Sequence, residues 1–243
     1  METATENGGT TGPVVAIDGP VASGKTSVGR AVAERMGFRF LDTGIMYRAV
    51  TWLAIKLSVN IDDSDAVGQL AESCEMSLVG DDPADLIVVD GHPLTAEDLA
   101  STQVDRNVSA VAASSPVRRA LVEQQRAIAS AGGIVMVGRD IGSVVLTDAD
   151  VKLYVDASPE ERARRRFRQQ KENGTDADYE QALADTIMRD LLDSQRADSP
   201  LTVPDDAVVI DTEHMDFEQS VATVMSEIST ATSDITSPEV TRR

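Results

Sequence analysis

Gly19-Pro-Val-Ala-Ser-Gly-Lys-Thr26 fits the phosphate-loop pattern G-x-x-x-x-G-K-[ST], and this stretch decides the fold. The apolar run Val14-Val-Ala-Ile17 precedes it, and a segment with helical periodicity, Ser27 to Met36, follows it. Glycines let a backbone turn tightly around phosphates, and the helix that follows adds the positive end of its dipole. The stretch therefore predicts a strand, a phosphate-binding loop and a helix that together hold a nucleoside triphosphate.

The residues of the loop have separate expected tasks. We expect Lys25 to bridge the β- and γ-phosphates and the Thr26 hydroxyl to ligate Mg²⁺. Contacts with the nucleotide are expected from the whole loop and the residue after it, namely Gly19, Pro20, Val21, Ala22, Ser23, Gly24, Lys25, Thr26 and Ser27.

Composition limits the class of protein. The 243 residues suit one α/β domain with an insertion, or two small domains. A net charge of −19 argues against a protein that binds nucleic-acid backbones, and the single Cys74 excludes a disulfide framework or a multi-cysteine zinc site. We find no stretch typical of a membrane span and no signal peptide in Met1–Pro13, so we expect a cytoplasmic protein.

Short apolar runs alternate with amphipathic helical stretches along the chain, which is typical of a parallel sheet covered by helices on both faces. The expected strands are Val14–Asp18, Arg39–Leu41, Ile134–Val137, Val151–Val155 and Ala207–Ile210.

Three segments differ from this pattern. Residues from about 60 to 105 contain acidic turns and a short β-like pair, Met76–Val79 and Leu86–Val89, and we expect them to form a small inserted substrate subdomain. The two ends, residues 1–12 and 229–243, are rich in Thr, Ser and Gly and are expected to be disordered.

A phosphate loop alone does not separate a kinase from a GTPase switch, a motor or a helicase. None of the four asparagines is followed by Lys, so the guanine-reading motif N-K-x-D of GTPases is missing. The chain instead places arginines at expected loop–helix junctions: Arg48, Arg118, Arg139, Arg189 and Arg196. Planar guanidinium groups suit an enzyme that must hold two phosphate-bearing anions. We therefore expect a kinase, with a slowly hydrolysing switch module as the alternative from another class.

Five further arginines lie between Arg162 and Arg168, and three of them, Arg162, Arg165 and Arg166, share one helical face. A solvated basic helix is one interpretation of this cluster, and nucleic-acid binding without an aromatic platform is another. We favour a lid helix, about residues 158–175, that closes over the nucleotide phosphates. The spacing does not tell which arginine reaches the transferred phosphate.

The motifs taken together resemble one family, the bacterial cytidylate kinases, which are nucleoside-monophosphate kinases. The resemblance extends from Val14 to Ile228 and rests on the phosphate loop and on the blocks Leu41-Asp-Thr-Gly-Ile-Met-Tyr-Arg48, Asn107-Val-Ser-Ala-Val-Ala112, Gly138-Arg-Asp-Ile-Gly142, Ala157-Ser-Pro-Glu-Glu-Arg-Ala163 and Arg189-Asp190 with Asp193 and Arg196.

The resemblance implies a phosphate-loop three-layer sandwich like that of adenylate kinase, with a five-stranded parallel sheet. The implied domain covers 13–230, with its core in 13–59 and 106–230, a monophosphate-binding insert and a mobile lid. The implied reaction is ATP + (d)CMP → ADP + (d)CDP, with Mg²⁺. A phosphate-loop kinase for another small acceptor, such as UMP, is the alternative. We expect a monomer that acts on small molecules, without nucleic acid or membrane.

The resemblance also implies roles for single residues. Ser109, Arg118 and Asp140 are expected at the cytosine, because a carboxylate can accept from its exocyclic amine while Arg and Ser donate to its other polar atoms. For the rest of the acceptor, we expect Arg48 and Arg139 at its phosphate, Arg189, Asp193 and Arg196 at the sugar and neighbouring phosphates, and Thr43 and Tyr47 along the pocket wall. Lys25, Arg139 and Arg189 are the expected catalytic residues.

One position departs from the family pattern. The family usually has an acidic residue immediately before Gly-Arg-Asp, where this chain has Val137. A carboxylate there would hold the water shell of the magnesium ion. Asp42 or Asp18 is expected to compensate, or else the enzyme is slower than its relatives.

Overall fold

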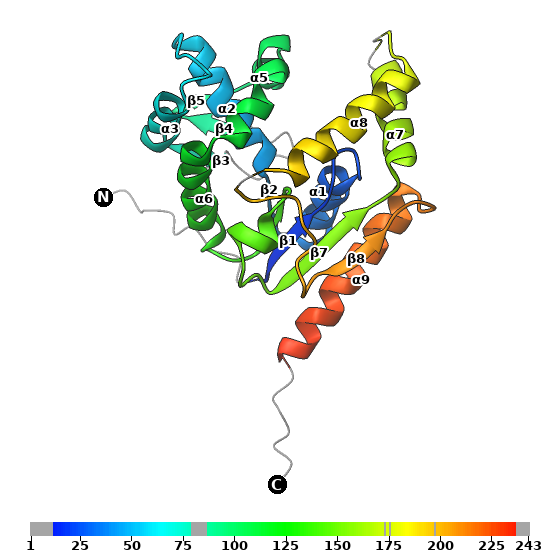
Figure 1. Cartoon of the computed structure of the whole chain (residues 1–243). Coiled ribbons are helices and arrows are strands. Elements are labelled where there is room, and N and C mark those ends of the chain that lie inside the picture. Colours follow the sequence, from blue (N-terminus) through cyan, green and yellow to red (C-terminus); the bar gives the residue numbers. More distant parts are fainter. Residues whose placement is uncertain (1–11, 79–86, 173, 175, 197, 237–243) are drawn as a thin grey trace, which may run out of the picture.

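A computed structural model of the chain describes residues 12–78, 87–172, 174, 176–196 and 198–236 (Figure 1). The expected disordered ends therefore lie outside the described residues, apart from Gly12 and residues 229–236. Val79, the last residue of the first expected β-like segment, and Leu86, the first residue of the second, lie outside them as well.

Five parallel strands form the central sheet. They are β1 (Val14–Asp18), β2 (Arg39–Asp42), β6 (Ile134–Val137), β7 (Val151–Asp156) and β8 (Val208–Asp211), in the order β2-β6-β1-β7-β8. Each expected strand is confirmed to within one residue at either end. The inner strands β1 and β6 are continuous apolar runs because both faces of the sheet are covered there, whereas Val208 and Val209 of the edge strand β8 are exposed.

Two layers of helices cover the sheet. Val15 and Ile17 of β1 face α1 (Lys25–Met36) and α9 (Phe217–Thr236), and their neighbour Ala16 faces the opposite layer. That layer contains α2 (Thr43–Lys56) and α6 (Ser115–Ala129). The alternation of side chains along β1 therefore produces the expected three-layer α/β sandwich, because successive residues of a strand point to opposite faces.

The phosphate loop joins β1 to α1 in a conformation that needs glycine. A Cβ on Gly19 would lie 2.1 Å from the carbonyl oxygen of Val155 on β7, so a side chain cannot be placed there. Gly24 has a φ of 92° at the N-cap of α1, in the left-handed region that favours glycine. No side chain caps this helix, which leaves its first amide groups free for a ligand.

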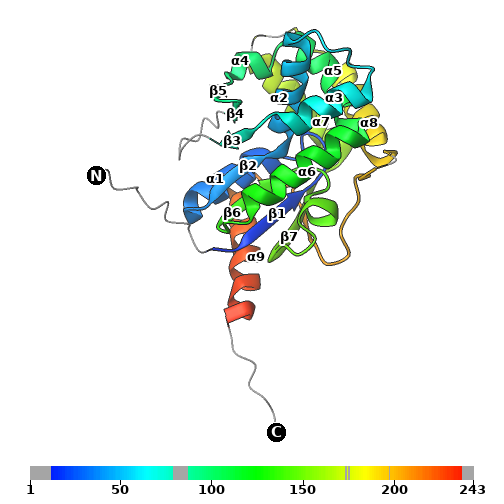
Figure 2. The same cartoon turned by 90° about the vertical axis from the view of Figure 1, so that its left-hand side faces the viewer.

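The remaining elements lie on either side of the phosphate loop. One group follows α2 and consists of α3 (Ser64–Ser73), α4 (Ala96–Leu99), α5 (Thr102–Ala113) and a small antiparallel sheet of β3 (Met76–Leu78), β4 (Ile87–Val89) and β5 (His92–Pro93). Figure 1 shows this group on the left and the paired helices α7 (Pro159–Glu172) and α8 (Tyr179–Ser194) on the right. Figure 2 shows α6 running along the layer of the sandwich beside this group. That residues 60–105 act as a separate subdomain, and that 158–175 act as a lid, stay predictions.

The prediction of a disordered C-terminal tail is wrong for residues 229–236, because α9 continues to Thr236. Ser and Thr in this stretch satisfy their hydroxyls on the preceding turn: Ser229 donates to the carbonyl of Met225 and Thr230 to that of Ser226. Ala231 packs against the core under α9, which holds the last turns in place. In the part of the chain that the structure describes, none of the helices has the length and apolar character needed to cross a membrane.

Candidate active site

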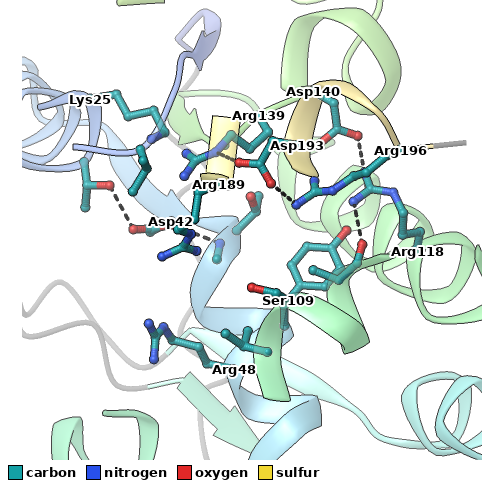
Figure 3. Close-up of a pocket in the computed structure, with 18 of the residues that line it drawn as sticks. Lys25, Asp42, Arg48, Ser109, Arg118, Arg139, Asp140, Arg189, Asp193 and Arg196 are labelled. Atoms are coloured by element: carbon teal, nitrogen blue, oxygen red, sulfur yellow. Dashed lines mark hydrogen bonds and ion pairs between the residues drawn. The ribbon is translucent and has the colours of Figure 1, made fainter. Parts of the chain in front are cut away.

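A cavity of about 250 Å³ opens between the phosphate loop, α2, α5 and α8 (Figure 3). Its lining includes all of the residues predicted for catalysis and for the acceptor: Lys25, Thr43, Tyr47, Arg48, Ser109, Arg118, Arg139, Asp140, Arg189, Asp193 and Arg196. Of the expected nucleotide-binding loop, Val21, Ala22, Lys25 and Thr26 line it, whereas Gly19, Pro20, Ser23, Gly24 and Ser27 do not. Motifs spread over 172 positions of the chain, from Lys25 to Arg196, thus meet in one place.

Lys25 marks one end of the cavity. Its Nζ donates to the carbonyl of Pro20 across the loop, at 3.0 Å. Burial lowers the pKa of Lys25 well below its usual value, and the nearby Arg139 charge lowers it further. A buried ammonium beside a second cation is a strong site for an anion. Ser27, by contrast, turns its hydroxyl back to the carbonyl of Gly24.

Arg118 and Asp140 form a buried ion pair at the opposite end of the cavity, as Figure 3 shows. The guanidinium lies over the ring of Tyr47, with 5.6 Å between its carbon and the ring centroid. Burial raises the pKa of Tyr47 to about 12, so this residue is a neutral platform for Arg118. The Nε of Arg118 is buried and has no hydrogen-bond acceptor within the described part of the chain. This end of the cavity therefore offers both a carboxylate and an unused donor.

Arg139 and Asp193 occupy the middle of the cavity (Figure 3). Arg139 donates from Nε to Asp193 at 2.8 Å and from Nη1 to the carbonyl of Gly19 at 3.2 Å. Asp193 also accepts from Arg196. Arg189 lies beside this group without a hydrogen bond to any described residue, and burial together with the Arg139 charge lowers its pKa. The middle of the cavity therefore carries more positive charge than its single carboxylate neutralises.

Three predicted residues line the cavity without contacting the pairs Arg118–Asp140 and Arg139–Asp193. Arg48 uses Nη1 for the carbonyl of Leu99 and for the carboxylate of Asp105, at 2.8 and 2.7 Å, which ties α2 to α4 and α5. The hydroxyl of Thr43 donates to the carbonyl of Val137 and is buried. Ser109 is exposed on the cavity wall. The structure thus brings Arg48 to the cavity but not into contact with Arg139.

The arginines of α7 have different environments, which their spacing did not reveal. Arg162 is buried, forms an ion pair with Asp190 of α8, and donates from Nη1 to the carbonyl of Val21 in the phosphate loop. Arg165 donates in the same way to the carbonyl of Ser23. These two side chains anchor the phosphate loop from outside the cavity.

Arg166 points to a second cavity, of about 640 Å³, that adjoins the first and shares Val21, Ala22 and Arg189 with it. Its Nε is buried without a hydrogen-bond partner among the described residues, and its charge lowers the pKa of Arg189. Two arginines that line one cavity and raise its positive charge favour an anion there.

Asp42 and Asp18, the two carboxylates expected to compensate for Val137, differ in their surroundings. Asp42 lines the first cavity and accepts from the Thr26 hydroxyl at 3.0 Å. Asp18 is buried and accepts from the amides of Ile141 and Gly142 at 2.6 and 2.7 Å, which fixes the turn that follows Arg139 and Asp140. Each directly follows the apolar residues of a parallel strand, a position that signals a residue at the carboxyl edge of the sheet.

Taken together, a parallel sheet, a phosphate loop after its first strand and a cavity with cations between two polar ends define a phosphoryl-transfer enzyme of the phosphate-loop class. Comparison with known proteins specifies the family. The family model of cytidylate kinase matches residues 15–230. The chain belongs to the cytidylate kinase family.

Individual relatives agree with the family model. The chain is 45% identical over 215 residues to cytidylate kinase of Limosilactobacillus fermentum, an alignment that covers 88% of this chain and 94% of the relative. It is 42% identical over 218 residues to cytidylate kinase of Pelotomaculum thermopropionicum, covering 89% and 96%. Among solved structures, shikimate kinase from Bacteroides thetaiotaomicron is similar with a TM-score of 0.45 and 12% identity, over 89% of this chain and 98% of that one.

Proposed function

We propose that this protein transfers a phosphoryl group from ATP to CMP and dCMP, giving CDP and dCDP, in the pyrimidine nucleotide metabolism of the cytoplasm. Membership in the cytidylate kinase family supports this reaction. The observation that carries it is the position of Arg139, which contacts both Gly19 of the phosphate loop and Asp193 of the opposite wall. A cation that contacts both sides is suited to hold the donor and acceptor phosphates near each other.

The donor end holds ATP through the free amides at the start of α1 and through Lys25. These groups are fixed before the substrate arrives, because Arg162 and Arg165 bind the loop carbonyls from behind. Preorganised donors of this kind stabilise charge as it develops in the transition state without first having to reorient.

The acceptor end recognises cytosine through Asp140 and Arg118. The carboxylate accepts from the exocyclic amine, and the unpartnered Nε of Arg118 donates to an acceptor of the base. Ser109 adds a hydroxyl from α5. Asp193 and Arg196 meet the sugar, while Arg48 and Arg139 hold the acceptor phosphate. Thr43 and Tyr47 support this wall of the cavity.

The transferred phosphoryl group passes between Arg139, Arg189 and Arg166. Arg166 is the arginine of α7 that we assign to this group, because Arg162 and Arg165 are engaged with the loop and Arg166 is not. The acceptor phosphate is itself the nucleophile, so no general base is needed. Closing of α7 over the cavity excludes water, which would otherwise be the competing acceptor.

Magnesium fits the donor end of the cavity. Thr26, in the first turn of α1, offers a hydroxyl oxygen, the kind of ligand that Mg²⁺ prefers, and the Asp42 carboxylate lies 3.0 Å from it. A bound Mg²⁺ supplies neutralisation of the β- and γ-phosphate charge. Thr26 would hold it through its hydroxyl oxygen.

The test is a panel of acceptors in an assay of ADP release. CMP, dCMP, UMP, AMP and shikimate are compared at equal concentration with ATP. CMP and dCMP are expected to give the highest kcat/KM. A better rate with any other acceptor would overturn the proposed substrate, and ATP hydrolysis that no acceptor stimulates would favour the switch module instead.

A further inference from the structure

We propose that Asp42 supplies the carboxylate that organises the magnesium site of this enzyme, from the strand next to the one that ends at Val137. Asp42 would align the Thr26 hydroxyl for the metal and accept a hydrogen bond from the metal's water shell. This inference rests on the proposed ATP-dependent reaction.

The hydrogen bond between Thr26 and Asp42 has the direction that a metal ligand needs. The hydroxyl of Thr26 donates to Oδ2 of Asp42 at 3.0 Å. A hydroxyl that gives its proton to a carboxylate keeps its lone pairs for a cation. The carboxylate therefore sets the orientation of the Thr26 oxygen and adds a negative charge beside the ion.

The sheet places Asp42 on the face that α1 covers. Strands β2 and β6 pair in register, with Asp42 beside Val137 and Phe40 beside Val135. Phe40 and Val137 both pack under α1, so Asp42, which follows the same alternation, also faces α1 and its first turn. A carboxylate at position 137 would approach Thr26 from the end of β6. Asp42 supplies a carboxylate at the same level of the sheet, from the end of the adjacent strand β2.

Asp18, the other carboxylate at this edge of the sheet, is buried and does not line the first cavity. Both of its oxygens accept from backbone amides, of Ile141 and Gly142. Asp42 also uses its second oxygen, Oδ1, which accepts from the amide of Gly44 at 2.9 Å as the N-cap of α2. That bond fixes the carboxylate and leaves Oδ2 directed at Thr26.

The metal must arrive together with the nucleotide. Within the described part of the chain there is no group of three His, Cys, Asp or Glu side chains that could hold a metal ion by itself. The Thr26 hydroxyl alone is too little to hold Mg²⁺, and phosphate oxygens and water would complete the shell. Asp42 is therefore expected to act on the affinity for the metal–nucleotide complex and not on the affinity for the nucleotide alone.

The experiment measures ADP binding by calorimetry with Mg²⁺ and with EDTA, in the wild type, Asp42→Asn and Asp63→Asn. The quantity compared is the factor by which Mg²⁺ tightens ADP binding. Asn keeps the N-cap of α2, because an amide oxygen caps as well as a carboxylate. Asp63 is the matched control, since it caps α3 by accepting from the amide of Ala66 and lies outside both cavities.

The factor is expected to fall about 10-fold in Asp42→Asn, in line with the loss on removing a residue that positions a metal ligand, and to stay within about 2-fold in Asp63→Asn. An unchanged factor in Asp42→Asn would overturn the inference, and so would an equal loss of affinity with Mg²⁺ and with EDTA. Wild-type protein that binds no ADP under either condition would instead overturn the proposed function.

Discussion

The guanidinium of Arg139 and the carboxylate of Asp193 form an ion pair of 2.8 Å between positions 54 residues apart in the chain. Asp193 is buried and accepts from Arg196 at the same time. One carboxylate thus holds two arginines that would otherwise repel each other in the middle of the cavity.

Replacing Asp193 with Asn is expected to lower kcat/KM for CMP about 100-fold, because two buried cations lose their only shared carboxylate and turn away from the acceptor. The KM for ATP is expected to change less than about 3-fold, since Lys25 and the loop amides do not contact Asp193. Steady-state kinetics with each substrate varied in turn measures both values. An equal loss for ATP and CMP would contradict the assignment of Asp193 to the acceptor side.

Replacing Asp140 with Asn is expected to reduce discrimination between CMP and UMP. The amide oxygen of Asn accepts from the cytosine amine more weakly than a carboxylate does, and its NH₂ group can donate to the carbonyl that uracil has at the same position. We expect kcat/KM for CMP to fall about 100-fold and the CMP-to-UMP ratio to fall at least about 10-fold. A ratio that stays constant while both rates fall would mean that Asp140 only supports Arg118.

Replacing Arg166 with Met is expected to lower kcat about 100-fold with little change in either KM, as for a group that stabilises charge in the transition state. Arg168→Met is the matched control, because Arg168 lies on the same helix and is exposed. We expect the control to stay within about 2-fold of the wild type. Equal effects of the two substitutions would show that α7 acts only through its general positive charge.

Much of this architecture could be predicted from local pattern. Strands β1 and β6 were predictable because a strand buried on both faces is a continuous apolar run. The loop was predictable because Gly19 and Gly24 have backbone requirements that other residues do not meet. The last turns of α9 could not be predicted in this way, because their Ser and Thr residues are also typical of a polar tail. What distinguishes them from a tail is the bonding of these hydroxyls to the preceding turn and the packing of Ala231 against the core.

The site was predictable only in part, because the partner of a buried charge comes from another element. Spacing put Arg162, Arg165 and Arg166 on one face of α7 but could not show that two of them meet the carbonyls of Val21 and Ser23. The sequence named both Asp42 and Asp18 as candidates to compensate for Val137, and only the register of β2 against β6 and the contact with Thr26 distinguish them. Family motifs helped most where both partners lie within motifs, as with Arg139 and Asp193.

Replacing Arg162 with Met is expected to destabilise the fold by about 3 kcal/mol, because it leaves the Asp190 carboxylate and the carbonyls of Ala157 and Val21 without their buried donor. Arg164→Met is the control, since Arg164 is half exposed in its ion pair with Glu161 and is expected to contribute less than about 0.5 kcal/mol. Urea unfolding of the two variants measures the difference. Equal stability of both would mean that the buried contacts of Arg162 add nothing to the fold.

Asp18 is expected to make stability depend on pH in a direction opposite to that of most carboxylates. Burial raises its pKa from 3.8 to about 6, and the nearby Asp140 charge adds to this, while the amides of Ile141 and Gly142 and the Lys25 charge act against it. Between these two pH values the folded state holds a proton that the unfolded state has released. The contribution of Asp18 is therefore fully present below about pH 4 and is lost as the pH rises to about 6, a change of about 3 kcal/mol.

The measurement is the free energy of unfolding of the wild type minus that of Asp18→Asn, from urea titrations at several pH values from 4 to 7. Asn cannot ionise. Its NH₂ group faces one of the two backbone amides that donate to the carboxylate, which makes the variant less stable at every pH. Only the slope of the stability difference against pH is therefore informative. The stability advantage of the wild type is expected to shrink as the pH rises from 4 to 6 and to level off above that. A difference that is flat or grows with pH over this range would show that the two backbone amides outweigh burial and that Asp18 ionises at or below its ordinary pKa.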